Sequence, residues 1–308
     1  MKISIVIVSW NGESYLHNCL KSLQKTTCSD CEIIVVDNAS EDGTRNMLQR
    51  EFPGIRCLAL PENLGFAEGC NRGIAVAKGE WIATLNQDTL LDSQWLVEMQ
   101  TQIKDSSQDL GMLQPRMLFM EEPERINSKG IALTASGFGI DRGFREPVGA
   151  GDRVEEIFCP TAGAALYRKS MLDGVRLQTG YFDRHFFMYG EDLDLGWRCR
   201  LAGWKALYVP MATVYHHYQG SVVKKTKQYA DAQIHKNRVR SLLKNGSSKM
   251  IFRNMNHVMY DFLLGFKYNG TRAAGNFISA VQSGLNQRPA VTSLVQIKRT
   301  SLEKRWIA

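Results

Sequence analysis

The sequence contains no long hydrophobic run. A helix that spans a membrane needs about 20 consecutive apolar residues, and the apolar runs in these 308 residues are far shorter. The N-terminal segment ISIVIVSW lacks the small-residue cleavage site of a secretory signal and is typical of a buried strand. We therefore expect a cytoplasmic protein, whose only contact with a membrane would be peripheral, at the inner face of the cytoplasmic membrane.

Cysteine is present, but not in the pattern of a disulfide framework or a zinc site. Seven cysteines are an odd number for a fully paired secreted framework. Cys28 and Cys31 form a single C-x-x-C, and no second pair of ligands follows at the spacing that zinc requires. These features predict free thiols.

The glycines do not form a known phosphate-binding loop. A dinucleotide site needs G-x-G-x-x-G after the first strand, where this chain has WNGES, and the P-loop pattern G-x-x-x-x-G-K-[ST] does not occur. If the protein binds phosphate groups, the remaining route is a divalent metal held by carboxylates.

Charge is divided unevenly along the chain. Residues 221–308 contain 16 Lys and Arg but only 3 Asp and Glu. Residues 1–220 contain 22 Lys and Arg and 28 Asp and Glu. A basic segment can meet nucleic acid or an anionic membrane surface. The basic part has few aromatic residues and no recognition motif, so we do not expect nucleic acid as a partner. The division predicts a main domain over 1–220 and a basic helical extension over 221–308.

Strand and helix patterns alternate through the first hundred residues. Apolar runs rich in Ile and Val alternate with segments whose apolar residues recur every three or four positions. The expected strands are 3–9, 32–38, 55–60 and 80–88, and the expected helices are 15–24, 43–52 and 66–77. Such alternation indicates an α/β fold with a mostly parallel, Rossmann-like sheet flanked by helices.

The rest of the chain is less regular. Residues 132–145 are rich in glycine and suit either a hairpin or a mobile loop. Segments 166–174 and 192–203 have helical spacing, and 206–210 is expected to be a short strand ended by Pro210. From about residue 225 onward the pattern is helical.

Polar side chains gather where the predicted strands end. They are Ser9, the pair Asp37 and Asn38, and the run Asn86, Gln87 and Asp88. Open α/β sheets bind ligands at this edge. Asp88 is a candidate metal ligand, although it could instead cap the following helix. Asp37 could bind a nucleobase or ribose, although an Asp in this place also suits a turn.

A carboxylate cluster follows the aromatic run in FFMYGEDLDL. Glu191 and Asp192 fall at a helix N-terminus, where the helix dipole stabilises negative charge. Burial beside the aromatic residues would raise a carboxyl pKa toward the value that suits a general base. We interpret Asp194, four residues before Arg198, as a member of a surface ion pair.

Four ordered segments resemble the family 2 glycosyltransferases, most closely the rhamnosyltransferase-like subgroup. They are ISIVIVSWNGESYLHNCLKSL, IIVVDNASEDGT, PENLGFAEGCNRGIAVAKGEWIATLNQDT and GYFDRHFFMYGEDLDLGWRCRLAGWKALYVPMATVYHHYQGS. The match extends with interruptions over about residues 3–245. The resemblance implies a GT-A fold, a nucleotide-sugar half over about 1–115 and an acceptor half over about 116–220. It also implies an inverting transfer that depends on Mg²⁺ or Mn²⁺.

The resemblance also implies roles for individual residues. Asp192 matches the catalytic base, and Asp88 ends the segment that replaces the family's D-x-D motif, so it would bind the metal. His216, five residues before Ser221, matches a histidine that completes the metal shell in some members, and His217 would then face away. The expected nucleotide-sugar ligands are Ser9, Asp37, Asn38, Gly65, Asn71, Asn86 and Gln87. Asn86 is a departure from the motif, because an aspartate is usual there.

The expected partners follow from the subgroup. The donor would be dTDP-rhamnose, with UDP-sugars as the alternative, and the acceptor a glycan or a polyprenyl-diphosphate-linked sugar in cell-surface polysaccharide synthesis. Residues 250–267 mix apolar and basic side chains as an interfacial helix does. The alternative is an ordinary helical subdomain or a homodimer contact.

A nucleotidyltransferase would need a Gly-rich, Arg-containing loop in place of WNGES, so we do not favour that class.

Overall fold

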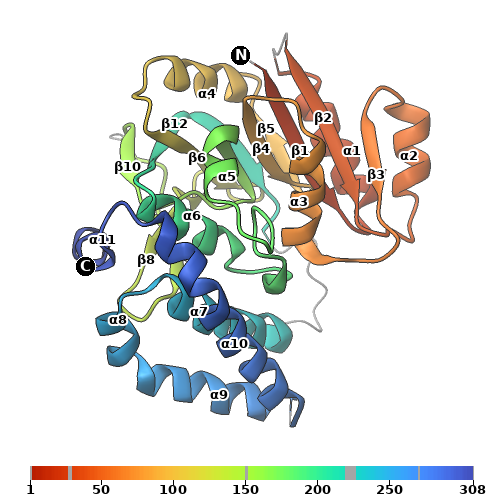
Figure 1. Ribbon diagram of the computed structural model, residues 1–308. Helices are drawn as coiled ribbons and strands as arrows, with labels where there is room; N and C mark the ends of the chain where they lie inside the picture. Colours follow the sequence, from red (N-terminus) through yellow and green to blue (C-terminus); the bar gives the residue numbers. More distant parts are fainter. Residues whose placement is uncertain (1, 27–29, 150–151, 219–226, 270, 308) are drawn as a thin grey trace.

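The computed structural model describes residues 2–26, 30–149, 152–218, 227–269 and 271–307 (Figure 1). Its strands are β1 (Ile3–Ser9), β2 (Cys31–Asp37), β3 (Arg56–Ala59), β4 (Trp81–Asn86), β5 (Thr89–Leu91), β6 (Leu110–Phe119), β7 (Ile126–Ser128), β8 (Ile131–Leu133), β9 (Gly139–Asp141), β10 (Glu155–Ile157), β11 (Ala164–Arg168) and β12 (Lys205–His216). Its helices are α1 (Glu13–Leu23), α2 (Thr44–Glu51), α3 (Gly65–Val76), α4 (Trp95–Lys104), α5 (Lys169–Gly174), the 3₁₀ turn η1 (Arg184–Phe186), α6 (Glu191–Leu201), α7 (Lys227–Asn245), α8 (Ser248–Arg253), α9 (Met255–Asn269), α10 (Thr271–Leu294) and α11 (Arg299–Trp306).

One large sheet organises the molecule. Its strands follow the order β10-β12-β6-β11-β4-β1-β2-β3, with β5 beside β12 and β7 beside β6. Strands β3, β2, β1 and β4 are mutually parallel, β6 and β12 run in the same direction, and β11 and β10 oppose them. The α/β fold predicted from the sequence, with a mostly parallel sheet flanked by helices, is confirmed.

Both faces of the sheet are covered because its central strands are apolar on both sides. Along β1, Ile5 and Ile7 pack with α1, α2 and α4, whereas Val6 packs on the other face with α3 and α6. Alternate residues of a strand point to opposite faces, so a continuous apolar run requires a layer on each side. Figure 1 shows helices on both sides of the red and orange strands.

The helical extension joins this core. Val239 and Leu242 of α7, Val291 of α10 and Leu302 of α11 are buried in the same cluster as Leu193 of α6. A C-terminal helical part is therefore present and packs on the sheet domain (Figure 1). The boundaries proposed at residues 115 and 220 stay predictions.

Three local expectations can be compared with the structure. The glycine-rich segment is a hairpin, because β8 pairs with β9 in antiparallel fashion. Of residues 166–174, only Lys169–Gly174 is helical, and the rest belongs to β11. The strand expected to end at Pro210 instead continues to His216. The register of β12 against β6 shifts between Val209 and Thr213, so Pro210 lies where no ladder hydrogen bond is required.

The cysteine expectation is wrong for one residue. Cys19, Cys57, Cys70, Cys159 and Cys199 carry free thiols, but Cys31 is disulfide-bonded. Cys28 lies outside the described residues. The number and spacing of the cysteines argue against a complete disulfide framework and against a zinc site. They do not show whether a single cysteine has another cysteine close enough to form a disulfide.

No helix in the part of the chain that the structure describes is long and apolar enough to cross a membrane.

Candidate functional site

The strand register brings the predicted polar residues to one edge of the sheet. Ser9 of β1 lies opposite Asp37 of β2, and Val8 lies opposite Asn86 of β4. The three parallel strands therefore end level with one another. His216 ends β12 at the same edge, since it pairs with Thr89 just after Asp88.

Asp88 and His216 form one corner of this edge. The His216 Nε2 atom lies 3.4 Å from Asp88 Oδ1, and its Nδ1 atom lies 3.0 Å from Asn127 Oδ1. An amide oxygen accepts hydrogen bonds, so Nδ1 donates to Asn127 and Nε2 is the ring atom that faces Asp88. The Asn86 amide nitrogen lies 3.5 Å from the same Nε2.

This corner can take part in binding a divalent metal but cannot enclose one. Within the described residues, no group of three or more His, Cys, Asp or Glu side chains could hold a metal ion. A carboxylate and an imidazole are suitable partial ligands, because Mg²⁺ at phosphate sites keeps waters and takes its other ligands from the substrate. The residues present therefore fit a metal that arrives with a diphosphate.

The other predicted donor ligands have structural contacts as well. Gln87 ties β4 to β1, since its Oε1 accepts from Ser9 Oγ at 2.7 Å and from the Trp10 N–H at 3.1 Å. Asp37 is fully buried, pairs with Arg45 and accepts from the Ser40 N–H at 3.2 Å, as the turn interpretation predicts.

Two further predicted ligands hold the loop before α3. Asn38 accepts from the Leu64 N–H at 2.9 Å and donates to the Gly65 carbonyl at 3.2 Å. Gly65 has φ +81°, and a Cβ atom there would lie 2.5 Å from the Phe187 carbonyl oxygen. Glycine is therefore required for the close approach of the segment that leads to Asp192.

Asn71 lies apart from this edge. Its side chain is buried and bonds both backbone groups of Phe182, with its Nδ2 atom 2.8 Å from the carbonyl and its Oδ1 atom 3.0 Å from the N–H. This pairing joins α3 to the segment before η1, so the structure gives Asn71 a packing role.

Glu191 and Asp192 occupy different surroundings at the start of α6. Glu191 is buried, and desolvation with the charges of Asp192 and Asp194 raises its pKa well above the usual value. Asp192 is partly accessible. Burial raises the pKa of Asp192, while N–H groups of Leu193 and Ala162 and the Thr161 hydroxyl bond its carboxylate and oppose the rise. Asp192 is therefore the carboxylate that a substrate can reach.

Asp88 and Asp192 lie at the same end of the molecule. The Asn86 N–H donates to the Gly163 carbonyl at 2.8 Å. Asp88 lies two residues beyond Asn86, and Ala162, which donates to Asp192, directly precedes Gly163. One backbone hydrogen bond therefore connects the segments that carry the two carboxylates.

Asp141 is a site residue that the sequence reasoning missed. It ends β9, and its carboxylate is close enough to Asp192 and His216 to interact electrostatically with both. Protein atoms surround the carboxylate although the residue is accessible to solvent, and this desolvation with the charge of Asp192 raises its pKa to about 6. The glycines around Asp141 in the sequence indicate a hairpin. No sequence feature indicates that Asp141 lies near Asp192 and His216.

Helix α7 also contributes to the site, which the sequence did not indicate. Residues Phe187, Tyr189 and Gly190 have φ values of +62°, +70° and +82°. Asn237 Nδ2 donates to the carbonyls of Met188 and Tyr189 at 3.0 and 2.8 Å. Positive φ is unfavourable for residues other than glycine, so the C-terminal extension holds the segment that presents Asp192.

The interpretation of Asp194 and Arg198 as a surface pair is wrong. Both side chains are fully buried, with Arg198 Nε 3.2 Å from Asp194 Oδ2. The buried Lys244 of α7 bridges Asp194 at 2.9 Å and Asp183 at 2.7 Å. Helical spacing shows that residues 194 and 198 face the same way, but whether that face meets solvent depends on α7.

The two adjacent histidines face different ways, as alternation along the strand predicted. His216 meets Asp88, whereas His217 pairs with Glu121 and lies against the Tyr15 ring at a centroid distance of 5.2 Å.

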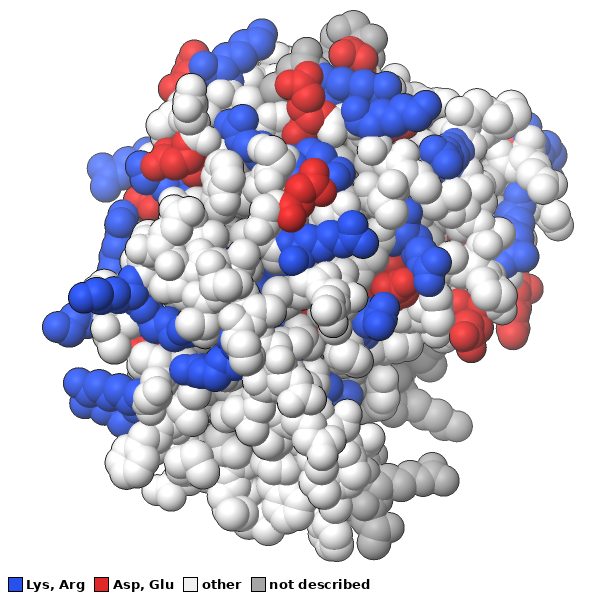
Figure 2. Space-filling model, in the orientation of Figure 1, with Lys and Arg blue, Asp and Glu red and all other residues white. Residues whose placement is uncertain are grey.

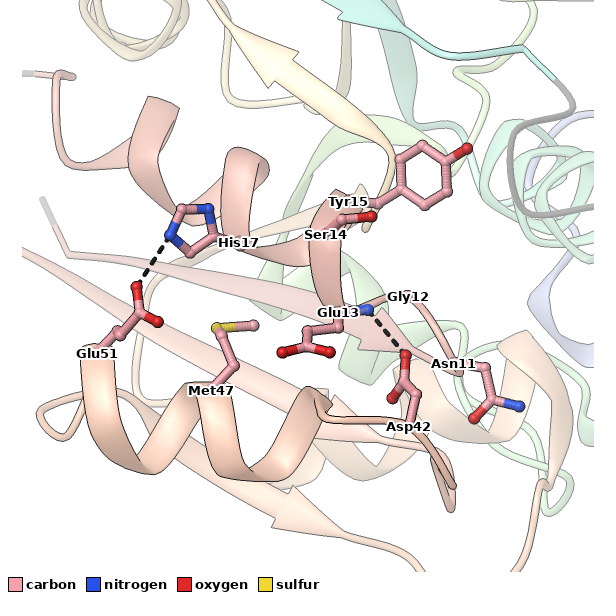
Figure 3. Close-up of a pocket in the computed structure, with 9 residues that line it drawn as sticks. All are labelled: Asn11, Gly12, Glu13, Ser14, Tyr15, His17, Asp42, Met47 and Glu51. Carbon is pink, nitrogen blue, oxygen red and sulfur yellow. Dashed lines mark hydrogen bonds and ion pairs between the residues drawn. The ribbon is translucent and has the colours of Figure 1, made fainter.

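A shallow pocket of about 400 Å³ lies between α1 and α2. Figure 3 shows its lining, with the Glu13 N–H bonded to Asp42 and His17 paired with Glu51. None of the predicted site residues lines it. The carboxylates of Glu13, Asp42 and Glu51 would repel a diphosphate, so we do not place the donor there.

Comparisons with known proteins agree on the family. The model of glycosyl transferase family 2 matches residues 4–176, more than half of the chain. An N-acetylglucosaminyl-diphospho-decaprenol L-rhamnosyltransferase of Mycobacterium tuberculosis is 27% identical over 238 residues, which cover 70% of this chain and 76% of that protein.

Solved structures agree on the fold. S. aureus TarS 1-349 matches with a TM-score of 0.58 at 18% identity, covering 96% of this chain and 83% of that one. GalNAc-T7, solved with UDP, GalNAc and Mn²⁺, matches with a TM-score of 0.66 at 15% identity, covering 94% and 55%. At these identities the likeness shows the fold alone, which is GT-A. With this fold, and with a family match over more than half of its length, the chain belongs to glycosyl transferase family 2 and is a glycosyltransferase.

Proposed function

We propose that the protein is an inverting, metal-dependent transferase that moves L-rhamnose from dTDP-rhamnose to a lipid-linked glycan acceptor. The placement of Asp192 is the observation that carries this proposal. Its carboxylate is partly accessible, its pKa is raised, and it lies at the same end of the sheet as Asp88 and His216. The rhamnosyl donor and the polyprenyl-linked acceptor are suggested by the mycobacterial relative.

Each residue would have a defined task. Asp192 takes the proton of the acceptor hydroxyl, and that oxygen attacks the anomeric carbon on the face opposite the leaving diphosphate, so configuration inverts. Asp88 and His216 would hold a divalent metal together with the diphosphate. A bound metal neutralises charge on the leaving group. The ends of β1, β2 and β4, with Ser9, Asp37 and Gln87, would receive the nucleoside.

The donor can be identified directly. Thermal shift with Mn²⁺ present should show the largest stabilisation by dTDP-rhamnose in a panel of nucleotide sugars, because a ligand that binds only the native state raises its stability. Stabilisation by UDP-sugars alone would favour the alternative, a UDP-sugar transferase of the same fold.

The catalytic assignment predicts the effect of Asp192→Asn. Turnover should fall about 10²–10⁴-fold, the usual contribution of a general base, while donor-induced thermal stabilisation is retained. Asp105→Asn, at an exposed residue that follows α4, is the matched control and should keep wild-type turnover. Wild-type turnover in Asp192→Asn would reject Asp192 as the base.

A further inference from the structure

The outer face of α8 and α9 is apolar. Phe252, Met259 and Leu263 are 81%, 59% and 58% exposed, and Met255, Tyr260 and Phe266 are also exposed. Met255, Met259, Leu263 and Phe266 follow one another at spacings of three or four, so they form a stripe along one side of α9, and Phe252 lies on the adjoining α8. The opposite side is already packed, with Val258 and Asp261 buried.

This stripe needs a partner to cover it. Water-soluble proteins seldom expose contiguous apolar patches larger than a few hundred Å² without using them. Figure 2 shows no acidic side chain over the lower lobe, where Figure 1 places α9 and the lower end of α10, and its basic side chains lie at the margin.

The exposed charged side chains of α8 are basic. Lys249 and Arg253 of α8 are exposed. The only acidic residue between positions 247 and 302 is Asp261, which is buried and paired with Arg238 and His235. Glu303 bonds the Ser247 N–H at 2.6 Å, which brings α11 and its exposed basic residues beside α8.

We propose that the outer face of α8 and α9 docks on an anionic lipid bilayer. Apolar side chains would enter the headgroup region while the neighbouring Lys and Arg meet anionic headgroups, the combination that holds interfacial helices. This proposal rests on the proposed function in one respect, the lipid-linked acceptor, which a protein docked on a bilayer could reach. The docked face connects to the site through α7. Arg238 of α7 binds Asp261, and Asn237 holds the loop before Asp192.

Flotation of the full chain with vesicles tests the proposal. The wild type should float with phosphatidylcholine vesicles that contain phosphatidylglycerol and far less with pure phosphatidylcholine. The double variant Met259→Glu/Leu263→Glu should lose about tenfold or more of this binding, because a charge in the stripe must be desolvated. Lys249→Glu/Arg253→Glu should lose the preference for anionic vesicles.

A matched control excludes a general effect of new charge. Val154→Glu/Met211→Glu changes two exposed apolar residues, one just before β10 and one in β12, and should float as the wild type does. All variants should keep the wild-type Tm, since the changed side chains are exposed. Wild-type flotation by Met259→Glu/Leu263→Glu, or no flotation of the wild type, would overturn the proposal.

Two outcomes separate this inference from its alternatives. If the wild type is a dimer that Met259→Glu/Leu263→Glu dissociates, and vesicles bind neither, the face joins two copies of the chain and the lipid proposal is wrong. If Asp192→Asn keeps full turnover, the proposed mechanism fails, yet vesicle binding is unaffected because the assay involves no sugar transfer.

Discussion

Neighbouring carboxylates in this protein differ in chemistry because their surroundings differ. Glu191 is buried beside α3, and within the described part of the chain its Oε2 has no hydrogen-bond partner. Asp192, one residue on, accepts from Ala162 and Thr161 and remains partly accessible. Burial with the charges of Asp192 and Asp194 raises the pKa of Glu191 well above its usual value, and burial also raises the pKa of Asp192. Access to substrate, and not the direction of the pKa shift, distinguishes Asp192 as the candidate base.

A pH profile can test how Asp141 acts on Asp192. A base must be deprotonated, so kcat/KM should rise with pH through the raised pKa of Asp192, above the usual value of about 3.9 for an aspartate. Above its own pKa of about 6, Asp141 is negative and disfavours a negative charge on Asp192. Asp141→Asn should therefore move to lower pH the part of the acid limb that lies above pH 6.

The position of the limb, and not the absolute rate, is the quantity to measure, because interacting carboxyls titrate together. Asp105→Asn serves again as the control and should leave the limb in place. A limb that extends above pH 6 and is unchanged in Asp141→Asn would show that the two carboxylates are not coupled.

At the scale of elements, α6 and α7 are joined by buried charge. Lys244 bridges Asp183 and Asp194, and Arg198 completes the pairing. Burial alone would raise the pKa of Asp183, but the charge of Lys244 with hydrogen bonds from Lys244 and His185 lowers the pKa far below its usual value. The same helix carries Asn237, so this network fixes both α6 and the loop that precedes it.

Loss of the bridging cation should be strongly destabilising. Lys244→Met leaves two buried aspartates without their shared partner, and removal of one member of a buried ion pair costs about 3–5 kcal/mol. Urea unfolding should show this loss at pH 7 and a smaller loss at lower pH, because the aspartates can then take up protons. Lys304→Met, at an exposed lysine of α11, should change stability little. A similar free energy of unfolding in both variants would contradict a structural role for Lys244.

The whole molecule shares one core between sheet and extension. Residues of α7, α9, α10 and α11 are buried in the cluster that covers one face of the sheet. The basic charge of the extension is partly used inside, since Arg238, Arg240 and Lys244 are buried. This use of charge leaves fewer cations for an external partner than the sequence count suggests.

We therefore expect the full chain to unfold in a single cooperative transition. Calorimetry should give one transition whose van't Hoff and calorimetric enthalpies agree. A chain that ends at residue 226 should fail to give a folded monomer by size exclusion, because α6 would expose the surface that α7 and α10 cover. Two separated transitions in the full chain would instead show that the extension folds by itself.

Local sequence pattern is enough to predict the class of fold and the sheet edge at which the candidate site lies. Continuous apolar strands such as Ile3–Ser9 alternate with helices and require a two-sided sheet, and the parallel register then places Ser9, Asp37 and Asn86 together. These features depend on local pattern and chain direction, which a sequence carries directly. Strand ends such as Pro210 were less predictable, because a bulge in the pairing with β6 removed the need for a ladder hydrogen bond.

Which charges are buried, and which residues from distant segments meet, depends on how the elements pack together. Asp141, Asn127 and Asn237 approach the predicted residues from distant segments, and no spacing in the sequence relates them. Asp194 is buried because α7 covers it, although its helical position suits an exposed ion pair equally well. Periodicity predicts which side of its own helix or strand a side chain faces. The pKa and the partners of that side chain depend on which residues of other elements pack against it.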